Sequence, residues 1–383
     1  MTIIPAFRSA TSLIPVPEPG ADLDWPAIVG AARSWDWPYE QMAVCQQDPL
    51  YHGEGDVAIH TRMVCEAMIA DPAWARLGPA RRAELLLAAL LHDVAKPVCT
   101  ELRDGRTHHP YHSRRGESIT RVLLWQAGLD YAARERIAHA VRYHQRPFFI
   151  LDNDNPERTV TEIAETVVPA ELAILARADS TGRICTDRQQ QLDAIELFSE
   201  TASEANCLQG PYPFRSGAAR FEYFARPGRD RDYEPYQPDN LPTITVLSGL
   251  PDSGKSSWAA TQNLPTICLD TIRQTTGTSP RDNQSPVINT ARNQARNILR
   301  QHRSLIWDAT NLSRQIRQNV INLAASYHTR VHIVAFEIHP EALEARNTSR
   351  PEPVPAAVIV RMLHHWEAPT TVECHRLEIH STR

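Results

Sequence analysis

The chain has 383 residues, a formal net charge of −5 and 42% apolar residues. This length predicts two or three domains, and two is the simplest interpretation, because one hydrophobic core rarely grows beyond about 250 to 300 residues. The sequence contains no apolar run near the roughly 20 residues of a membrane span, and its first residues lack a signal-peptide pattern. Seven scattered cysteines without a CxxC pair argue against a disulfide framework or a cysteine zinc site. We therefore expect a cytoplasmic protein with no membrane partner.

Charge and lysine usage both vary along the chain. Residues 1–240 hold 25 basic and 34 acidic side chains, and residues 241–383 hold 15 and 11. A mildly cationic second half is compatible with a phosphate-rich substrate, and equally with two ordinary protein surfaces. Only two of the 40 basic residues are lysines, Lys96 and Lys255. Lysine is a slim point charge where arginine is a broad planar fork, so these two positions indicate tight sites.

The first 208 residues predict helices. Residues 1–40 form an N-terminal extension of unclear role, in which Trp25, Trp35 and Trp37 are expected to pack rather than to react. From residue 41 to 208, apolar residues recur at helical spacing and no convincing strand interrupts them. The strongest helical patterns cover residues 57–69, 81–95, 118–128, 133–144 and 169–179. We predict an all-α domain over residues 41–208.

Histidines and carboxylates that could bind a metal lie in or at the ends of these predicted helices. His92 and Asp93 lie at the end of a very apolar helix that Pro97 is expected to stop. If the helix continues to Lys96, that side chain shares a face with His92. His60 lies in an earlier helix and Asp179 in a later one. Two imidazoles and two carboxylates suit a divalent transition metal with open positions for water and substrate.

The order H…HD…D, with the phrases "HDVAKP", "YHSRRGES" and "YHQRP", resembles the HD phosphohydrolase superfamily over residues 50–185. The resemblance implies that His60, His92, Asp93 and Asp179 bind a metal, and that Lys96 steadies charge on a phosphoryl group. His112 and His144 would be ligands of a second metal bridged by Asp93, or phosphate contacts. The sequence does not distinguish Zn, Mn, Ni, Co or Cu. The remaining histidines considered are expected to be structural, namely His52, His108, His109 and His139.

The composition and the pattern of apolar residues change after residue 208. Residues 209–241 are rich in Pro, Gly, Arg and aromatic residues, which predicts a linker whose aromatics either join two domains or stack on bases. From residue 242 to 383, short β-branched runs alternate with helical stretches. These runs are "TITVLSG", "TICLD", "SLIWDAT" and "VHIVAFEI". The alternation predicts an α/β domain with a parallel sheet and crossover helices.

The segment "GLPDSGKSS" contains the phosphate-binding pattern GxxxxGK[ST] between a predicted strand and a predicted helix. In this pattern, backbone N–H groups surround a phosphate, Lys255 reaches the β and γ oxygens, and Ser256 binds Mg²⁺. We therefore predict a P-loop for ATP or another nucleoside triphosphate with Mg²⁺. Its candidate residues are Gly249, Ser253, Gly254, Lys255, Ser256 and Ser257.

Further polar residues follow the later predicted strands. Asp270 and Arg273 follow the second strand, at the carboxyl edge of the sheet where ligands bind. Asp308 and Asn311 lie on the same edge after the third strand. Two arginines four residues apart, Arg346 and Arg350, lie on one helical face that Pro351 is expected to end. Such a pair suits a lid that closes over a triphosphate.

These motifs resemble the polynucleotide 5′-hydroxyl kinases of the P-loop class. The resemblance implies that Asp270 is the general base, that Arg273 contacts the 3′ phosphate of the acceptor, and that Arg346 and Arg350 form the lid. Asp308 and Asn311 match a recurrent motif and belong to the substrate-binding set, without separate duties assigned.

Together the two halves are similar to the bacterial HD-Pnk family of end-healing enzymes. The similarity implies an all-α metal-dependent phosphoesterase followed by an α/β P-loop kinase. The first would open a 2′,3′-cyclic phosphate and remove the 2′-phosphate, and the second would phosphorylate the 5′ end of RNA or DNA. Neither lysine stands in a KxDG context, so we expect a separate ligase to act downstream.

Two alternatives stay open from the sequence. One is a nucleotide-metabolising HD phosphohydrolase fused to a small-molecule kinase. The other is a regulatory protein in which ATP binding drives a conformational change. RNA versus DNA preference, the number of metal ions and the oligomeric state are left undetermined.

Overall fold

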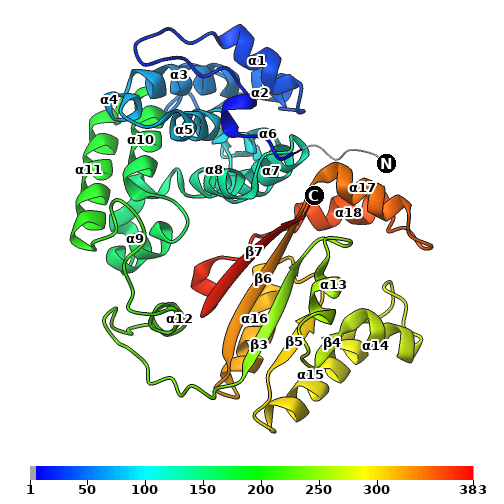
Figure 1. Cartoon of the computed structure of the whole chain (residues 1–383). Coiled ribbons are helices and arrows are strands. Elements are labelled where there is room, and N and C mark those ends of the chain that lie inside the picture. The colour runs from blue at the N-terminus through cyan, green and yellow to red at the C-terminus, as the bar shows by residue number, and fades with distance from the viewer. Residues whose placement is uncertain (1–5, 383) are drawn as a thin grey trace. The chain divides into compact units, whose positions relative to one another are not determined.

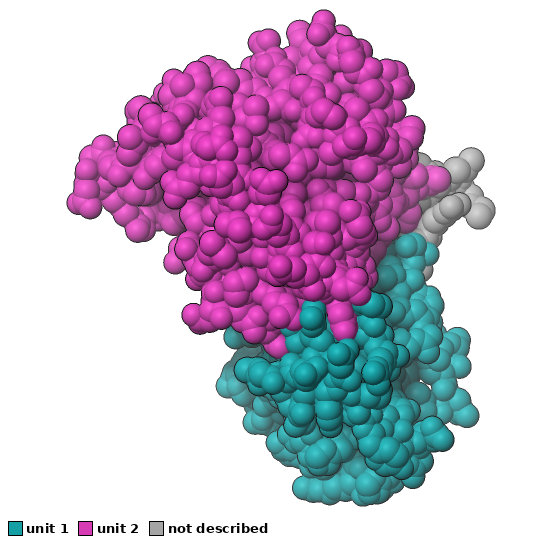
Figure 2. Space-filling model, turned by 90° about the vertical axis from the view of Figure 1, so that its left-hand side faces the viewer, with its two compact units in different colours: residues 1–5, 213–383 teal, residues 6–212 magenta. Residues whose placement is uncertain are grey.

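The computed structural model describes residues 6–382, which form two compact units (Figures 1 and 2). The first unit covers residues 6–212 and the second begins at Pro213. Figure 2 colours the first magenta and the second teal. Among the described residues, no helix combines the length and the apolar character needed to cross a membrane.

The first unit is almost entirely helical, as its apolar periodicity predicts. Its elements in chain order are η1 (Ala10–Ser12), α1 (Trp25–Arg33), α2 (Tyr39–Ala43), α3 (Val57–Ala70), α4 (Pro72–Ala75), α5 (Pro79–Leu91), α6 (Lys96–Cys99), β1 (Glu101–Arg103), β2 (Arg106–His108), α7 (His112–Gln126), α8 (Tyr131–Tyr143), η2 (Arg146–Asp152), α9 (Pro156–Ala164), α10 (Pro169–Thr181) and α11 (Arg188–Glu204).

One apolar core holds these helices together. The central helix α5 is buried along residues 82–91, because neighbouring helices surround it and none of its faces is exposed to solvent there. Carboxylates cap the helices around it: Asp56 accepts from the amide of Ile59 at the start of α3, and Asp130 from that of Ala133 at the start of α8. The predicted N-terminal extension joins the same core through Trp25, Trp35 and Trp37; residues 1–5 lie outside the described part.

Two local expectations in this unit were wrong. A two-stranded hairpin, β1 and β2, interrupts the helices, and its turn is Asp104-Gly105 with positive φ at both residues. An Asp-Gly pair is a strong hairpin signal that the helical pattern had hidden. Helix α5 ends at Leu91, and Pro97 lies in the first turn of α6 instead of stopping α5. Proline is tolerated there because the first-turn amide needs no helical partner.

The second unit is an α/β domain with a five-stranded parallel sheet, which confirms the predicted fold class. Its elements are α12 (Gly217–Ala225), β3 (Thr243–Gly249), α13 (Lys255–Ala260), β4 (Thr266–Cys268), α14 (Leu269–Thr276), α15 (Ser285–Leu299), β5 (Leu305–Asp308), α16 (Arg314–Ala325), β6 (Arg330–Ile338), α17 (Pro340–Thr348), α18 (Ala356–His364), η3 (Thr371–Glu373) and β7 (Arg376–Thr382).

Two elements of this unit did not follow from the sequence. Strand β7 pairs with β6 at one edge of the sheet, from His332↔Arg376 to Ile338↔Thr382. Its sequence, "RLEIHST", alternates polar and apolar residues and lacks the continuous apolar run of the inner strands. Helix α12 lies inside the predicted linker, and it packs on the second unit because Phe221 stacks on His375 with ring centroids 4.3 Å apart.

Strand order places the predicted phosphate loop at the centre of the sheet. The order is β4-β5-β3-β6-β7, so the central strand β3 is flanked by β5 and β6. The chain moves to one side of β3 for β4 and β5 and to the other side for β6 and β7, as Figure 1 shows. Such a reversal opens a crevice beyond the carboxyl ends of the strands, where ligands of open α/β sheets bind.

Candidate functional site

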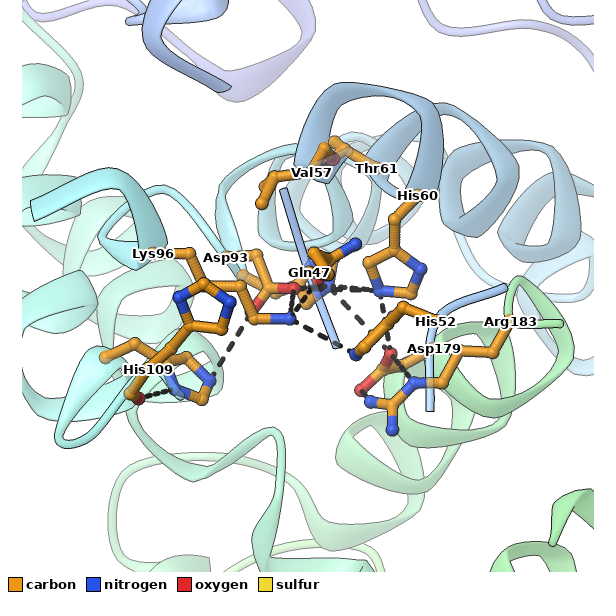
Figure 3. Close-up of polar contacts among 12 residues, drawn as sticks. Gln47, His52, Val57, His60, Thr61, Asp93, Lys96, His109, Asp179 and Arg183 are labelled. Carbon is orange, nitrogen blue, oxygen red and sulfur yellow. Dashed lines mark hydrogen bonds and ion pairs between the residues drawn. The ribbon is translucent and has the colours of Figure 1, made fainter. Parts of the chain in front are cut away.

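In the first unit, four predicted ligand residues from three regions of the chain converge on one point. The Nε2 atoms of His60, on α3, and His92, directly after α5, are 3.2 Å apart. Asp179 on α10 places Oδ1 3.1 Å from His60 Nε2, and Asp93 places Oδ2 3.2 Å from His92 Nε2. All four side chains are at most 1% exposed. Figure 3 shows the carboxylates of Asp93 and Asp179 both lying close to the ring of His60.

The other two predicted histidines face the second oxygen of Asp93. His112 Nε2, from the start of α7, lies 3.4 Å from Asp93 Oδ1, and His144 Nε2, from the end of α8, lies 3.9 Å away. Asp93 therefore turns one oxygen toward His60 and His92 and the other toward His112 and His144. A carboxylate placed this way can bridge two metal ions.

Backbone carbonyls fix the ring orientation of three of these histidines. The Nδ1 atoms of His92, His112 and His144 each donate to the carbonyl three residues earlier, at 2.7, 2.7 and 2.8 Å. This contact leaves each Nε2 with a lone pair for a metal. Burial, aided by His92 and His112, lowers the pKa of His144 to about 3, so this ring is neutral at pH 7.

His60 is oriented by a carboxylate that the sequence did not reveal. Glu54 Oε1 lies 2.9 Å from His60 Nδ1 and 2.8 Å from His52 Nδ1. The other oxygen accepts from the amide of Ile184 at 2.9 Å. A carboxylate behind a metal-binding imidazole fixes its tautomer and raises its basicity. Burial opposes ionisation of Glu54, but these hydrogen bonds hold its pKa well below the usual range.

The donors fit one or two divalent cations. Oδ1 of Asp93 and Nε2 of His112 are buried and make no hydrogen bond with any described residue, whereas Oδ2 of Asp93 has the Lys96 ammonium 2.6 Å away. Burial would raise the pKa of Asp93, but His92 and Lys96 hold it well below the usual range, so the carboxylate is ionised. Burying the ionised Oδ1 of Asp93 and the Nε2 of His112 without a hydrogen bond is costly unless a cation binds them.

Lys96 contacts this centre, but it is not placed there by helix α5 as predicted. Because α5 ends at Leu91, Lys96 does not share a helical face with His92; its Nζ instead lies 2.6 Å from Asp93 Oδ2. Nζ also donates to Gln47 Oε1 at 2.6 Å and lies 3.5 Å from His52 Nε2. His52, expected to be merely structural, thus borders the centre (Figure 3), and burial with Lys96 lowers its pKa to about 4.

Arg183 is a further residue that the sequence analysis missed. Its Nε and Nη2 bind the two oxygens of Asp179 at 3.0 and 2.6 Å. The Arg–carboxylate fork fixes the plane of Asp179, and Arg183 is the main group that keeps the pKa of Asp179 well below normal against the effect of burial. The i, i+4 spacing of Asp179 and Arg183 was an available signal for this pair, although α10 ends at Thr181 and Arg183 lies just beyond it.

In the second unit, the predicted phosphate loop joins β3 to α13. Gly249 ends β3, and a Cβ there would lie 2.7 Å from the carbonyl oxygen of Phe336, so no side chain fits. Gly254 has φ of +99° directly before α13. Lys255 Nζ donates to the carbonyls of Gly249 and Leu250 at 3.0 and 2.6 Å. These contacts hold the Lys255 side chain against the backbone of the phosphate loop. Burial lowers the pKa of Lys255 to about 8.

Strand β5 supplies the next residues of this site. Asp308, at its end, accepts from Ser256 Oγ at 2.8 Å, the arrangement expected around a Mg²⁺ ion. Asn311 lies close by, but its Nδ2 donates to the carbonyl of Leu247 at 2.6 Å. Asn311 thus supports β3, and only its buried Oδ1 is without a hydrogen bond. Ser253 is buried within the loop, and Ser257 is exposed on α13.

Asp270 and Arg273 lie on the first turns of α14, at the carboxyl end of β4. They form an ion pair, and Arg273 Nε donates to Gln284 Oε1 at 2.8 Å. The Asp270 side chain is 81% exposed. It is therefore open to a substrate hydroxyl.

The two predicted lid arginines both contact the phosphate loop. Arg346 donates to the carbonyl of Asp252 at 2.9 Å, and Arg350 to Asp252 Oδ1 at 2.8 Å. Helix α17 ends at Thr348, so the expectation of one continuous helical face was wrong. Arg350 reaches the loop from the segment after the helix.

One groove of about 2250 Å³ contains these residues of the second unit. This volume exceeds the roughly 300–1000 Å³ typical of small-molecule pockets. Its lining brings together Lys255, Asp270, Arg273, Asp308, Arg346 and Arg350.

Comparisons with known proteins agree with this division. Residues 57–184 match the HD domain family. Residues 244–369 match an AAA domain family, and this range contains the phosphate loop described above. No curated protein matches the chain. Among solved structures, one of a "putative kinase" from Chloroflexus aurantiacus J-10-fl is 13% identical and covers 38% of this chain and 87% of its own, with a TM-score of 0.30.

The chain thus joins a helical HD domain to a P-loop domain with a parallel five-stranded sheet. The HD domain carries His/Asp clusters suited to a metal, and the P-loop domain carries a nucleotide-binding loop. These features indicate a hydrolase and a kinase in one polypeptide.

Proposed function

We propose that the protein heals broken nucleic acid ends. Its HD domain is a metal-dependent 2′,3′-cyclic phosphodiesterase and 2′-phosphatase, and its P-loop domain is an ATP-dependent polynucleotide 5′-hydroxyl kinase. The products are RNA or DNA ends ready for a separate ligase. The observation that carries the proposal is the groove of the P-loop domain, which continues beyond the phosphate loop to an exposed carboxylate paired with an arginine, Asp270 and Arg273.

In the HD domain, His60, His92, Asp93 and Asp179 would bind one divalent metal ion such as Zn, Mn, Ni, Co or Cu. Asp93, with His112 and His144, would bind a second. A bound ion lowers the pKa of water toward neutrality, which supplies hydroxide for attack on phosphorus. The ammonium of Lys96, 2.6 Å from Asp93 Oδ2, attracts a phosphate to this centre and stabilises its developing negative charge.

In the P-loop domain, Lys255 leaves its carbonyl partners to bind the β- and γ-phosphates, and Ser256 binds Mg²⁺. A phosphate of the acceptor binds Arg273 and thereby breaks the ion pair between Arg273 and Asp270. The freed carboxylate accepts the proton of the 5′-hydroxyl as that oxygen attacks the γ-phosphate, whose bond to the β-phosphate oxygen breaks to release ADP. Arg346 and Arg350 move from Asp252 to the transferring phosphoryl group and stabilise its charge.

The test offers the purified protein several acceptors with labelled ATP and Mg²⁺: oligonucleotides with a 5′-hydroxyl, free nucleosides, and no acceptor. We expect label only on oligonucleotide 5′ ends. Transfer to nucleosides alone would favour a small-molecule kinase, and ATP turnover without acceptor would favour a regulatory role. For the HD domain, an oligonucleotide ending in a 2′,3′-cyclic phosphate should yield free 2′- and 3′-hydroxyls once metal is added.

A further inference from the structure

Three arginine guanidinium groups line the groove of the P-loop domain without a partner. Those of Arg281, Arg292 and Arg361 make no hydrogen bond or ion pair with any described residue. In contrast, Arg273 and Arg350 in the same groove are paired with carboxylates, Asp270 and Asp252. The groove therefore holds cationic charge that the protein itself does not neutralise.

Two of the three unpaired arginines lie on the wall beside Arg273. Arg281 is in the loop that joins α14 to α15, and Arg292 is on α15 itself. Gln284, Ile288 and Arg292 all line the groove, and their spacing of four residues places them on one face of the helix. Gln284 in turn binds Arg273 at 2.8 Å. One continuous surface thus runs from Arg273 along α15 to Arg292.

The length of this surface exceeds a mononucleotide. Gln284, the residue before α15, and Arg292 are eight positions apart, which corresponds to about 12 Å at 1.5 Å per residue. A stacked strand advances about 3.4 Å per nucleotide, so this distance spans roughly three to four nucleotides. The apolar surface of Ile288 lies between the cations, and Ile316 of α16, 50% exposed, also lines the groove. Alternating cationic and apolar surface suits the phosphates and bases of a single strand.

We propose that this wall, Arg281 and Arg292 with Ile288 between them, is the binding path for the acceptor strand behind its 5′ end. The inference rests on the proposed kinase activity and adds a substrate length: the preferred acceptor is a single strand of at least about three nucleotides. Guanidinium groups bind phosphodiesters without reading the base or the 2′-hydroxyl, so RNA and DNA strands occupy the path alike.

The test measures kinase KM and kcat for 5′-hydroxyl strands of two to eight nucleotides, for wild type, Arg292→Ala and Arg281→Ala. Wild-type KM should fall with length up to about four nucleotides and then level off. Each variant should raise KM for the eight-nucleotide strand about tenfold, leave KM for the dinucleotide and kcat unchanged, and reduce the salt dependence of binding by about 0.7 in log–log slope. Arg292→Lys keeps the charge and should recover most of the affinity.

Arg296→Ala is the matched control, because Arg296 lies one turn further on α15, is exposed and does not line the groove. Equal effects of Arg292→Ala and Arg296→Ala would overturn the strand path, as would a wild-type KM that does not depend on length. Either result would leave the proposed kinase activity intact. No phosphorylation of any strand by wild type would overturn both. Thermal unfolding of each variant shows whether it folds.

Discussion

The two candidate phosphate sites differ in how their side chains are arranged and held in the structure. In the HD domain, charged side chains from distant parts of the chain are buried together, and each is held by further contacts such as Glu54 behind His60 and Arg183 behind Asp179. In the P-loop domain, a short contiguous loop provides the binding groups, and Asp270, the proposed general base, is 81% exposed. Buried contacts hold the side chains of the first site in place without a ligand, whereas in the proposed mechanism the second site exchanges internal contacts for ligand contacts.

This contrast predicts that single changes in the two sites act independently. Asp93→Asn removes a bridging charge between the histidines of the HD domain, so metal binding and water activation are both lost. We expect phosphoesterase activity to fall more than about a thousandfold, since several kcal/mol of charge stabilisation disappear. Metal content by mass spectrometry should fall with it. Kinase activity in the same preparation is the control, and its loss would contradict independent sites.

Asp270→Ala is the corresponding change in the P-loop domain. Loss of a general base should lower kinase kcat about 10²- to 10⁴-fold. The dissociation constant of ATP should stay within about twofold, because Asp270 pairs with Arg273 and forms no hydrogen bond with the described residues of the phosphate loop. Phosphoesterase activity should be unchanged. A large loss of ATP affinity would show that Asp270 acts in nucleotide binding instead of proton transfer.

Glu54→Gln tests whether the HD centre depends on contacts behind its ligands. The amide keeps the shape of Glu54 but lacks the charge that polarises His60, so metal affinity should fall about 10- to 100-fold. Competition with a chelator of known affinity measures this change without any activity assay. Glu66→Gln is the matched control, since Glu66 is a partly exposed residue of α3, the helix that carries His60, and pairs with Arg62. Equal metal affinity of both variants would contradict the role of Glu54.

The same contrast explains which features were predictable from the sequence. Four of the five parallel strands follow from short β-branched runs, whereas β7 has an alternating polar and apolar pattern that does not stand out in the sequence. The phosphate loop is contiguous and therefore visible in the sequence. Glu54 is a different case, because its contact with Ile184 joins residues 130 positions apart. Its role depends on how α10 approaches α3, which local patterns do not specify.

Lys255 gives the P-loop site a pH dependence. Burial lowers its pKa to about 8, so the free protein loses this proton above pH 8, whereas ATP binds the charged form. ATP affinity should therefore be constant below pH 8 and fall by about tenfold per pH unit above it, until the pKa of the complex is reached. Calorimetric titrations between pH 7 and 9.5 measure the slope and the accompanying proton uptake. A constant affinity across this range would contradict the lowered pKa.

The smallest expected effect concerns the resting position of the lid. Arg350 binds the carboxylate of Asp252, whereas Arg346 binds its backbone carbonyl, so Asp252→Asn weakens only the first contact. Because this ion pair is partly exposed, its loss is worth at most about 1 kcal/mol, and the freed Arg350 should raise ATP affinity two- to fivefold. Glu344→Gln removes the same charge from an exposed position of α17 and should have no effect. A tenfold loss of ATP affinity in Asp252→Asn would show instead that Asp252 binds the nucleotide or its Mg²⁺, and the loop would then be preformed like the HD centre.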